Sequence, residues 1–489
     1  MLTNYIVLAL YMGILLLIGV VAARQVKDIK DYYVGGKKLS YWVVAFSSRA
    51  TGSSAWVLLG LSGMGAIWGV FAYWVVLGTV SGVAISWFVM GKPFKRLTDR
   101  FDSITIPDYL ESRFQATSPR IRLVAALALT FFVTIYVSAQ IDATGTAFES
   151  FLDWNYYTGA IVGFIIVVLY MSFGGFIAVA WSDVFQGGIM LLGLVLLPMV
   201  MLTQIPNSLS QEIQVVDADL LSFWGPGGFS ALNLAKIIGF VMIGLGFLGS
   251  PQLFVRFMSI RREDEIDRGK WVSVLLTFIM NFSAVSIGIL GRALFTSAGD
   301  DPTQVLGNGG QEVLLYAAGQ LLPAVIGSFY IAAVLSAIMS TIDSLLVVAS
   351  SAVSRDLYQK VYNPSLSDQQ LSAFSTRVTL LLSVASLVLA LAVAYFSPTR
   401  TIFWFVIFGW SGIAATFCPM MILSLFWKEY TEQGALASMV TGFLSVPFFK
   451  FVLPQWEAIA PYLVNMAELF PSFILSLLAG YIVSIRRHL

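Results

Sequence analysis

Residues 41–59 read YWVVAFSSRATGSSAWVLL. Both ends of this stretch are apolar, whereas the nine residues from Ser47 to Ala55 are small or polar and include Arg49. An unsatisfied backbone group is expensive in lipid, so an unwound stretch persists only where protein buries it or where it lines a cavity, in which its carbonyls can bind a cation. The stretch therefore predicts a broken membrane helix. The alternative is a tight helix crossing, which also favours small residues.

The composition of the whole chain is typical of a membrane protein. Of 489 residues, 58% are hydrophobic and 11% are charged, against about 25% charged in ordinary soluble domains. The net charge of +1 offers no basic surplus for binding nucleic acid. One cysteine, Cys418, and one histidine, His488, exclude an internal disulfide, thiolate or histidine metal cages and Ser/His/Asp triads. We expect neither an enzyme nor an organic cofactor.

A helix needs about 20 apolar residues to cross a hydrocarbon core of about 30 Å. Runs of this length, about thirteen in all, predict spans at 3–24, 41–67, 69–91, 121–148, 155–175, 177–203, 232–258, 271–297, 323–354, 376–396, 401–427, 434–452 and 467–485. The first run has no basic n-region and no small-residue cleavage site, so it reads as a retained helix.

Lysine and arginine between these spans gather on one side of the predicted membrane, in residues 24–38, 92–122 and 256–270. Because cytoplasmic loops carry such an excess, we expect the N-terminus outside and the C-terminus in the cytoplasm. The external connections 204–231 and 298–322 are either linkers or part of a lid. Residues 1–489 are predicted to form a single transporter domain.

A second polar segment, SAIMSTIDS at residues 336–344, lies inside a predicted span. Helical spacing places Ser336, Ser340 and Ser344 on one stripe with Thr341 beside it. Sodium prefers oxygen ligands, and neutral oxygens suit an ion that must also leave. The alternative is that these hydroxyls bond back to their own helix.

Four charged residues lie within or near the predicted membrane: Arg49, Asp142, Asp183 and Asp343. A charge at mid-bilayer costs at least about 2.5 to 3.5 kcal/mol, so each should face a partner or a water-filled cavity. We expect Arg49 to pair with one of the aspartates, and the spacing leaves open which one. Such a pair is either a coupling or gating element or a static salt bridge.

Short motifs follow one another along nearly the whole chain, in residues 31–36, 106–109 with 113–114, 173–183, 246–251, 337–341, 355–358 and 434–437. In this order they resemble the solute:sodium symporter family, and within it the chain is most similar to bacterial sodium/proline symporters. The resemblance implies a LeuT-like fold of two inverted five-helix repeats, 41–203 and 232–427, with an extra helix at 3–24 and two more at 434–485.

The resemblance also implies a sodium site. In the family, carbonyls of the first broken helix and a carbonyl and two hydroxyls from the second repeat hold the ion. The matching residues here are Ala50, Ser53, Ala337, Ser340 and Thr341, which include part of the stripe found from spacing. Asp183 matches a family aspartate on the sodium route. Asp142, Asp183, Asp343 and Arg49 are the candidate coupling or gating residues.

Two positions in the broken helix depart from the proline symporters. These have an aspartate where this chain has Gly52 and a glycine where it has Arg49. Near the expected solute, they have a tryptophan and a tyrosine where this chain has Ile243 and Phe247. Arg49 is either a surrogate cation over the ion site, which would weaken sodium dependence, or a bidentate clamp for a solute carboxylate.

The expected function is sodium-coupled import of a small organic solute, with L-proline first, by alternating access across a bacterial-type cytoplasmic membrane. A monomer in the lipid bilayer should suffice. The alternative is a proton-coupled or sodium-coupled carrier of another amino acid or carboxylate. Six residues are predicted to bind solute, although ordinary helix packing also explains the aromatic ones: Ser54, Trp56, Tyr136, Phe247, Pro251 and Trp410.

Overall fold

The computed structural model describes residues 2–171, 175–457 and 459–486. Residues 173 and 174 of the motif at 173–183, and His488, lie outside this part. All regular elements in the described residues are helices, and one isolated parallel bridge joins Leu39 to Ile260. The prediction of an all-α fold is therefore confirmed for the described chain.

The first half of the chain, as described, forms α1 (Leu2–Ala23), α2 (Ile29–Val34), η1 (Gly35–Lys37), α3 (Tyr41–Ala55), η2 (Trp56–Leu61), α4 (Ser62–Trp68), η3 (Gly69–Ala72), α5 (Tyr73–Ile85), η4 (Ser86–Met90), α6 (Gly91–Arg100), α7 (Ile106–Phe114), α8 (Arg120–Leu152), α9 (Tyr156–Met171), α10 (Gly175–Thr203), α11 (Leu209–Val216) and η5 (Ala218–Leu221).

The second half forms α12 (Ala231–Met242), η6 (Ile243–Leu248), α13 (Pro251–Ser259), η7 (Glu263–Glu265), α14 (Ile266–Phe295), α15 (Pro302–Leu306), η8 (Asn308–Gly310), α16 (Val313–Leu321), α17 (Ala324–Ser351), η9 (Ala352–Tyr362), α18 (Asp368–Phe396), α19 (Ile402–Phe426), α20 (Glu432–Pro447), η10 (Phe448–Val452), η11 (Leu453–Gln455), α21 (Ala460–Met466) and α22 (Leu469–Ile485).

Each predicted span coincides with one or more of these helices. By length and composition, ten described helices can cross a membrane, or eleven if the bent pair α21 and α22 counts as one span. One of them, Tyr41–Arg100, has 60 residues, and at 1.5 Å per residue it would be about three times as long as the hydrocarbon core is thick. The chain reverses inside it at Gly69 (φ 56°, ψ −136°), so this run contains two predicted spans. The count of thirteen stays a prediction.

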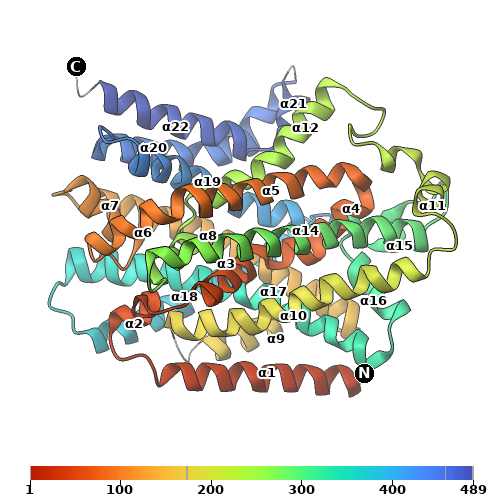
Figure 1. Cartoon of the computed structure of the whole chain (residues 1–489), viewed down its shortest axis with the longest axis horizontal. Coiled ribbons are helices and arrows are strands. Elements are labelled where there is room, and N and C mark those ends of the chain that lie inside the picture. Colours follow the sequence, from red (N-terminus) through yellow and green to blue (C-terminus); the bar gives the residue numbers. More distant parts are fainter. Residues whose placement is uncertain (1, 172–174, 458, 487–489) are drawn as a thin grey trace.

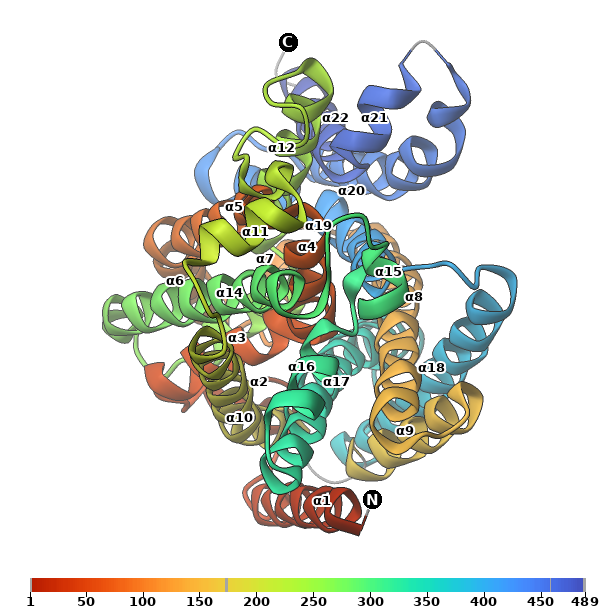
Figure 2. The same ribbon diagram turned by 90° about the vertical axis from the view of Figure 1, so that its right-hand side faces the viewer.

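The long helices lie side by side, with α1 at one edge of the molecule and α20 and α22 at the opposite edge (Figures 1 and 2). The α1 helix packs on α10 and α17, whereas α20 and α22 pack on α19. The α3 helix lies between them, against α10, α13, α14 and α17. Residues from Arg49 to Ala55 of α3 are all buried, so the polar stretch singled out in the sequence lies in the protein interior.

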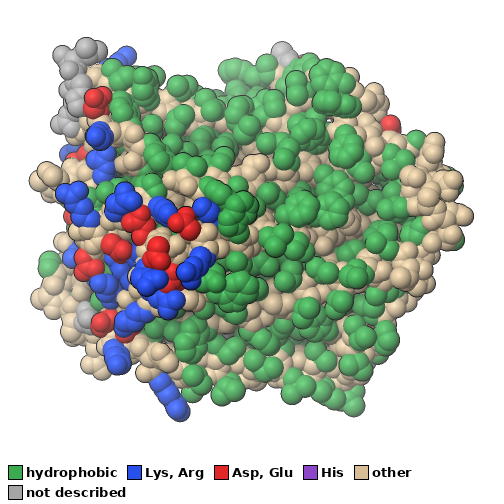
Figure 3. All heavy atoms as spheres, in the orientation of Figure 1, with side chains coloured by type: hydrophobic (Ala, Val, Ile, Leu, Met, Phe, Trp, Pro, Cys, Tyr) green, Lys and Arg blue, Asp and Glu red, His purple; other side chains and the backbone are tan. Residues whose placement is uncertain are grey.

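Charged side chains gather at one end of the molecule, over α2, α6 and α7 (Figure 3). We call this the charged end, and the end that carries α11 and α15 the opposite end (Figure 1). Elsewhere this face is largely hydrophobic (Figure 3), and large apolar side chains such as Leu77, Phe131 and Leu381 are about half exposed or more. A lipid environment explains such exposure, because monomeric soluble proteins rarely show wide apolar surfaces.

Two helices are broken near the middle of the molecule. The α3 helix remains helical through Ser53 and breaks at one residue, Ser54 (φ 44°, ψ −173°), before the π-helical η2 segment. The predicted broken helix is therefore present, with its break at one residue, and the other small residues keep helical geometry because neighbouring helices bury most of them. The second break follows η6, at Gly249 (φ 158°) and Ser250.

The two broken helices are joined at the charged end. The Leu39 N–H donates to the Ser259 carbonyl (3.0 Å), and the Arg261 N–H donates to the Leu39 carbonyl (2.9 Å). This parallel bridge connects the residues just before α3 with those just after α13.

Glycines let α5 approach the end of α12 and the start of η6 closely. A Cβ built on Gly78 would lie 2.1 Å from the Val241 carbonyl oxygen, and one on Gly244 would lie 2.0 Å from the Gly78 carbonyl oxygen. Both contacts involve backbone, which cannot rotate away as a side chain can. By contrast, a Cβ on Gly188 of α10 would meet nothing within 4 Å.

We expect Gly78→Ala to lower the stability of the purified protein by about 1 to 3 kcal/mol, because the added methyl group overpacks a backbone contact. Gly188→Ala is the matched control and should unfold at the wild-type temperature or slightly above. Thermal unfolding in detergent measures both. Equal unfolding temperatures for the two variants would contradict the close packing of α5 on α12.

Candidate ion and solute sites at the broken helices

The break in α3 is held by a side chain from α8. Gln140 Oε1 accepts a hydrogen bond from the Ala55 N–H (3.0 Å), and Ser54 Oγ accepts one from the Trp56 N–H (3.3 Å). A non-glycine residue with positive φ persists only where its surroundings over-determine it. Gln140, which sequence reasoning missed, provides part of that support.

Hydroxyls of α17 face carbonyls of α3. Ser340 Oγ lies 3.3 Å from the Ala50 carbonyl oxygen and 3.3 Å from that of Ala337. Thr341 Oγ1 lies 3.1 Å from the Thr51 carbonyl oxygen and 3.0 Å from that of Ala337. Four of the five predicted sodium ligands, Ala50, Ala337, Ser340 and Thr341, are thus brought together. Hard monovalent cations prefer oxygen ligands of this kind.

The fifth predicted ligand is the carbonyl of Ser53, which accepts a hydrogen bond from the Trp56 N–H. The Ser53 hydroxyl donates to the Arg49 carbonyl (2.9 Å) and accepts from Arg49 Nε (2.9 Å). Conversely, the Thr51 carbonyl, which was not predicted, lies beside Thr341. On α17 the hydroxyls of Ser340 and Ser344 also bond back to carbonyls one turn earlier. The alternative for the stripe, hydroxyls that bond back to their own helix, is thus observed, and it leaves the hydroxyl lone pairs available to a cation.

The expected pair between Arg49 and an aspartate is not formed in the described chain. Asp183 pairs instead with Arg256 of α13, whose Nη2 lies 2.8 Å from Asp183 Oδ2. Both side chains are buried. From the sequence, Arg256 falls among the cytoplasmic positive charges, because it lies near the end of an apolar run. Its burial corrects that assignment.

The guanidinium of Arg256 connects four helices. Its Nε donates to Ser47 Oγ (2.9 Å), and its Nη2 donates to Ser344 Oγ (2.6 Å) and to Thr51 Oγ1 (2.5 Å). Ser47 Oγ in turn donates to Asp183 Oδ2 (2.6 Å). The cluster therefore ties α3, α10, α13 and α17 together directly beside the five carbonyl and hydroxyl oxygens described above.

Asp343 adds a second carboxylate to this cluster. Its Oδ1 accepts from Ser344 Oγ (3.3 Å), while Asp343 Oδ2 and Asp183 Oδ1 are buried without a hydrogen-bond partner among the described residues. Arg256 pairs with Asp183, whereas no ion pair within 4 Å includes Asp343 in the described chain. Buried unsatisfied acceptors are costly, so this arrangement favours the uptake of a small cation or a proton.

Asp142 lies towards the opposite end and has other partners. Its Oδ1 accepts from Arg400 Nε (3.0 Å), also binds Arg400 Nη2, and accepts from the Tyr156 hydroxyl (2.5 Å). Arg400 lies just before α19, whereas Asp142 belongs to α8. The pair can hold the start of α19 against α8, which is a suitable place for a gate.

Four of the six predicted solute-binding residues gather between the two breaks. The Tyr136 hydroxyl donates to Ser54 Oγ (3.4 Å), and the Trp410 ring lies 6.5 Å from the Tyr136 ring and 5.0 Å from the Phe247 ring, centroid to centroid. Trp410 Nε1 donates a hydrogen bond to the Ile243 carbonyl (3.1 Å). Ser54, Tyr136, Phe247 and Trp410 therefore form a common wall.

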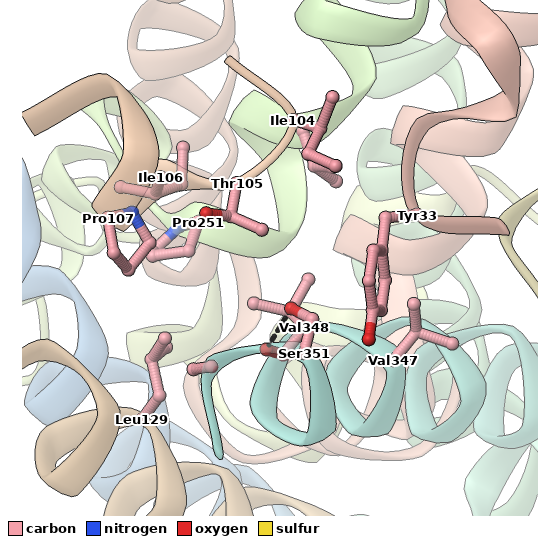
Figure 4. A pocket seen from close by; sticks show the side chains of 12 residues that line it. Tyr33, Ile104, Thr105, Ile106, Pro107, Leu129, Pro251, Val347, Val348 and Ser351 are labelled. Carbon is pink, nitrogen blue, oxygen red and sulfur yellow. Dashed lines mark hydrogen bonds between the residues drawn. The ribbon is translucent and has the colours of Figure 1, made fainter. Parts of the chain in front are cut away.

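The other two predicted solute-binding residues lie on either side of this wall. Pro251 lines a small cavity of about 20 Å³, with Tyr33, Thr105 and Ser351 around it (Figure 4). The Trp56 ring packs on Phe403 at a centroid distance of 6.2 Å, and Phe403 lines a second cavity of about 160 Å³. The first cavity borders α7 at the charged end, and the second borders Gly309 and Thr401 towards the opposite end.

An ion network lies beside the cavity of Figure 4 and unites two of the sequence motifs. Arg122 binds Asp108, Asp356 and Glu111. Burial opposes ionisation of Asp108, but the charges of Arg355 and Arg122 outweigh it and lower the pKa of that carboxyl. The network joins α7, α8 and η9, and it closes the charged end around the cavity.

Comparison with known families matches residues 32–442 to the model described as "Sodium:solute symporter family". The match covers most of the chain, including both breaks. The chain belongs to the sodium:solute symporter family. This symporter is consequently a multi-pass membrane transporter and not an enzyme, and the resemblance inferred from the motifs is confirmed.

Curated relatives of this symporter span nearly the whole chain. The high-affinity proline transporter PutP of Bacillus subtilis is 34% identical over 477 residues, which are 96% of this chain and 95% of the relative. The osmoregulated proline transporter OpuE of the same organism is 33% identical, with 98% and 93% covered. Sodium/proline symporter 2 of Staphylococcus saprophyticus is 31% identical, with 98% and 92% covered.

Solved structures resemble this symporter in fold. A sodium-coupled sialic acid symporter in a substrate-bound outward-open state matches with a TM-score of 0.79 at 20% identity, covering 99% of this chain and 98% of that one. Mhp1, a nucleobase-cation-symport-1 family transporter, matches with a TM-score of 0.52 at 13% identity, with 94% and 93% covered. At these identities the likeness concerns the fold alone.

We expect Arg256→Leu to destabilise the protein by about 3 to 5 kcal/mol, because it leaves the Asp183 carboxylate buried without its cation. The double variant Arg256→Leu with Asp183→Asn should recover part of that loss. The matched control is Arg262→Leu, which removes an exposed pair with Asp264 and should cost at most about 1 kcal/mol. Thermal unfolding compares the three. A double variant less stable than Arg256→Leu would contradict the pairing.

Proposed function

We propose that this symporter imports L-proline together with sodium by alternating access. The family assignment and the relatives that carry proline support the solute. The arrangement that supports sodium is the meeting of the Ser340 and Thr341 hydroxyls with the Ala50 and Thr51 carbonyls. An ion held there would contact α3 and α17 at once, so its binding would favour one relative position of these helices.

The wider architecture follows the same proposal. Residues 41–203 and 232–427 form two inverted repeats, each beginning with one of the broken helices, and α1, α20 and α22 lie outside them. The chain crosses a bacterial cytoplasmic membrane thirteen times with its C-terminus inside, in agreement with the gathering of lysine and arginine at the charged end (Figure 3). One chain in the bilayer contains both sites, so a monomer suffices, and no organic cofactor is needed.

The driving force is adequate for concentrating a solute. One sodium ion moving inward gains about 2.3 kcal/mol per 100 mV of membrane potential, in addition to its concentration gradient. At about 1.4 kcal/mol per factor of ten, this corresponds to roughly 50-fold accumulation of a neutral zwitterion.

Reconstituted protein in liposomes should take up labelled L-proline in response to an inward sodium gradient, and this uptake should saturate. A potassium gradient of the same size is the control for the salt, and protein-free liposomes are the control for leakage. Saturable uptake that needs sodium supports the proposal. No sodium-dependent uptake of proline would overturn the choice of proline as solute.

A proton is the second candidate for the coupling ion, because Asp343 and Asp183 each have a buried carboxylate oxygen without a described partner. Under this alternative, an imposed inward proton gradient drives uptake without sodium, and Asp343→Asn abolishes that response. The same liposomes distinguish the two ions when the sodium and proton gradients are imposed separately.

Thr341→Val should raise the sodium concentration required for half-maximal uptake by about tenfold or more, because it replaces an oxygen ligand with a methyl group. The maximal rate at saturating sodium should fall less. Ser336→Ala is the matched control, since Ser336 lies on the same stripe but bonds to the Tyr11 hydroxyl (3.1 Å). An unchanged sodium requirement in Thr341→Val would remove this residue from the ion site.

A further inference from the structure

Arg49 is a buried cation without an anion. Its side chain is 3% exposed, and no ion pair within 4 Å includes it in the described chain. Arginine stays charged in proteins. The aspartates expected as its partners are bound elsewhere, Asp183 to Arg256 and Asp142 to Arg400.

Hydrogen bonds fix the guanidinium of Arg49 and leave one of its three nitrogens, Nη2, without a partner. Arg49 Nε donates to Ser53 Oγ (2.9 Å) and Nη1 donates to Thr277 Oγ1 (3.1 Å), whereas Nη2 has no partner in the described chain. Thr277 belongs to α14, and its own hydroxyl donates to the Ser273 carbonyl (2.7 Å), so its lone pairs remain directed at Arg49. The arginine is thus positioned by two residues that leave its charge uncompensated.

The free nitrogen lies next to space and an aromatic wall. A Cβ built on Gly52 would lie 3.2 Å from Arg49 Nη2 and 3.3 Å from Phe247 Cε1, so a side chain at this position would crowd the free nitrogen, and glycine leaves it uncovered. The Arg49 Cζ atom lies 5.7 Å from the centre of the Phe247 ring. Arg49 also lines a small cavity together with the hydroxyl-bearing side chains Ser48, Ser86 and Ser273.

A buried, unpaired charge inside a membrane protein is expensive, and intramembrane arginines normally face a partner or a water-filled cavity. Here the free nitrogen faces the wall of Phe247 and Trp410, next to the break at Ser54. An anion that enters and leaves during transport would supply the missing partner. A role as substitute for the ion on α17 is not supported, because the described contacts of Arg49 go to Ser53, Thr277 and Phe247.

We propose that Arg49 binds the carboxylate of the transported solute through Nη2, while the hydrocarbon part of the solute packs on Phe247. This inference rests on the proposed function, in which the chain carries a small organic solute, and it narrows that solute to a carboxylic acid. An amide or ester of the same shape lacks the negative charge and is rejected, since a hydrogen bond between two charged groups is about twice as strong as a neutral one.

The test uses thermal unfolding of the full-length purified protein in sodium buffer with pairs of small acids and their amides as probes: L-proline and L-prolinamide, L-alanine and L-alaninamide, L-lactate and L-lactamide, and pyruvate and pyruvamide. We expect at least one acid to raise the unfolding temperature and its amide to leave it unchanged, because a ligand that binds the native state stabilises it.

Arg49→Gln should weaken binding of the stabilising acid by about tenfold or more, as for other hydrogen bonds to charged groups, and should abolish the difference from its amide. Arg49→Lys keeps the positive charge but lacks the rigid, planar guanidinium, so it should retain part of that difference. Arg292→Gln is the matched control, because Arg292 is also a buried arginine without an ion pair within 4 Å in the described chain, and it should behave as wild type.

Gly52→Asp provides an independent check. Its carboxylate would lie beside Arg49 Nη2, neutralise it and fill the space for the solute, so acid binding should be lost although the arginine is still present. Wild-type acid preference in either Arg49→Gln or Gly52→Asp would overturn the proposal. So would a wild-type protein that no acid stabilises more than its amide.

These outcomes are distinct from failure of the proposed function. If another acid stabilises the protein and proline neither binds nor enters liposomes, the choice of proline fails while the role of Arg49 stands. If proline enters with sodium and Arg49→Gln leaves its half-saturating concentration unchanged, the role of Arg49 fails while the proposed function stands.

Discussion

The ion pair between Arg256 and Asp183 is the constraint around which the interior is organised. Charges in a medium of low dielectric interact strongly, and each of them must keep its hydrogen bonds satisfied. Arg256 does so by reaching Ser47, Thr51 and Ser344 as well as Asp183. These partners belong to α3, α17 and α10, so one guanidinium sets the distances between the helices that form the candidate ion site. The break at Ser54 lies only three residues beyond Thr51.

The helices and their approximate ends could be predicted from the sequence because the requirement is local. A stretch of about 20 apolar residues has to be helical in lipid whatever its neighbours are. The same reasoning located the break in 41–59 and the polar stripe at 336–344, since polar residues inside such stretches need a special environment. It did not place the break within the stretch: Ser47 to Ser53 remain helical where α3 packs against α10, α14 and α17, and Ser54 alone departs from helical geometry.

The partners of the charges could not be predicted in this way. The sequence identifies both Arg49 and Asp183 as charges inside the predicted membrane. Which cation pairs with which carboxylate, however, depends on how helices that are far apart in the sequence pack against each other. Arg256, at the end of an apolar run, reads equally well as a loop residue. Gln140 supports the break from α8, and nothing in its own neighbourhood indicates this. Family resemblance supplied the residues Ala50, Ala337, Ser340 and Thr341, but not the neighbouring Thr51 carbonyl.

The backbone bridge between Leu39 and Ile260 limits how the molecule can move. It clamps the charged ends of the two broken helices to each other through main-chain hydrogen bonds, which no change of rotamer can release. As long as these hydrogen bonds are kept, the two ends cannot separate from each other. Any opening towards the charged end that keeps this bridge therefore moves α3 and α13 as one unit, away from α17, whose Ser351 lies across the cavity from Pro251 of α13 in Figure 4.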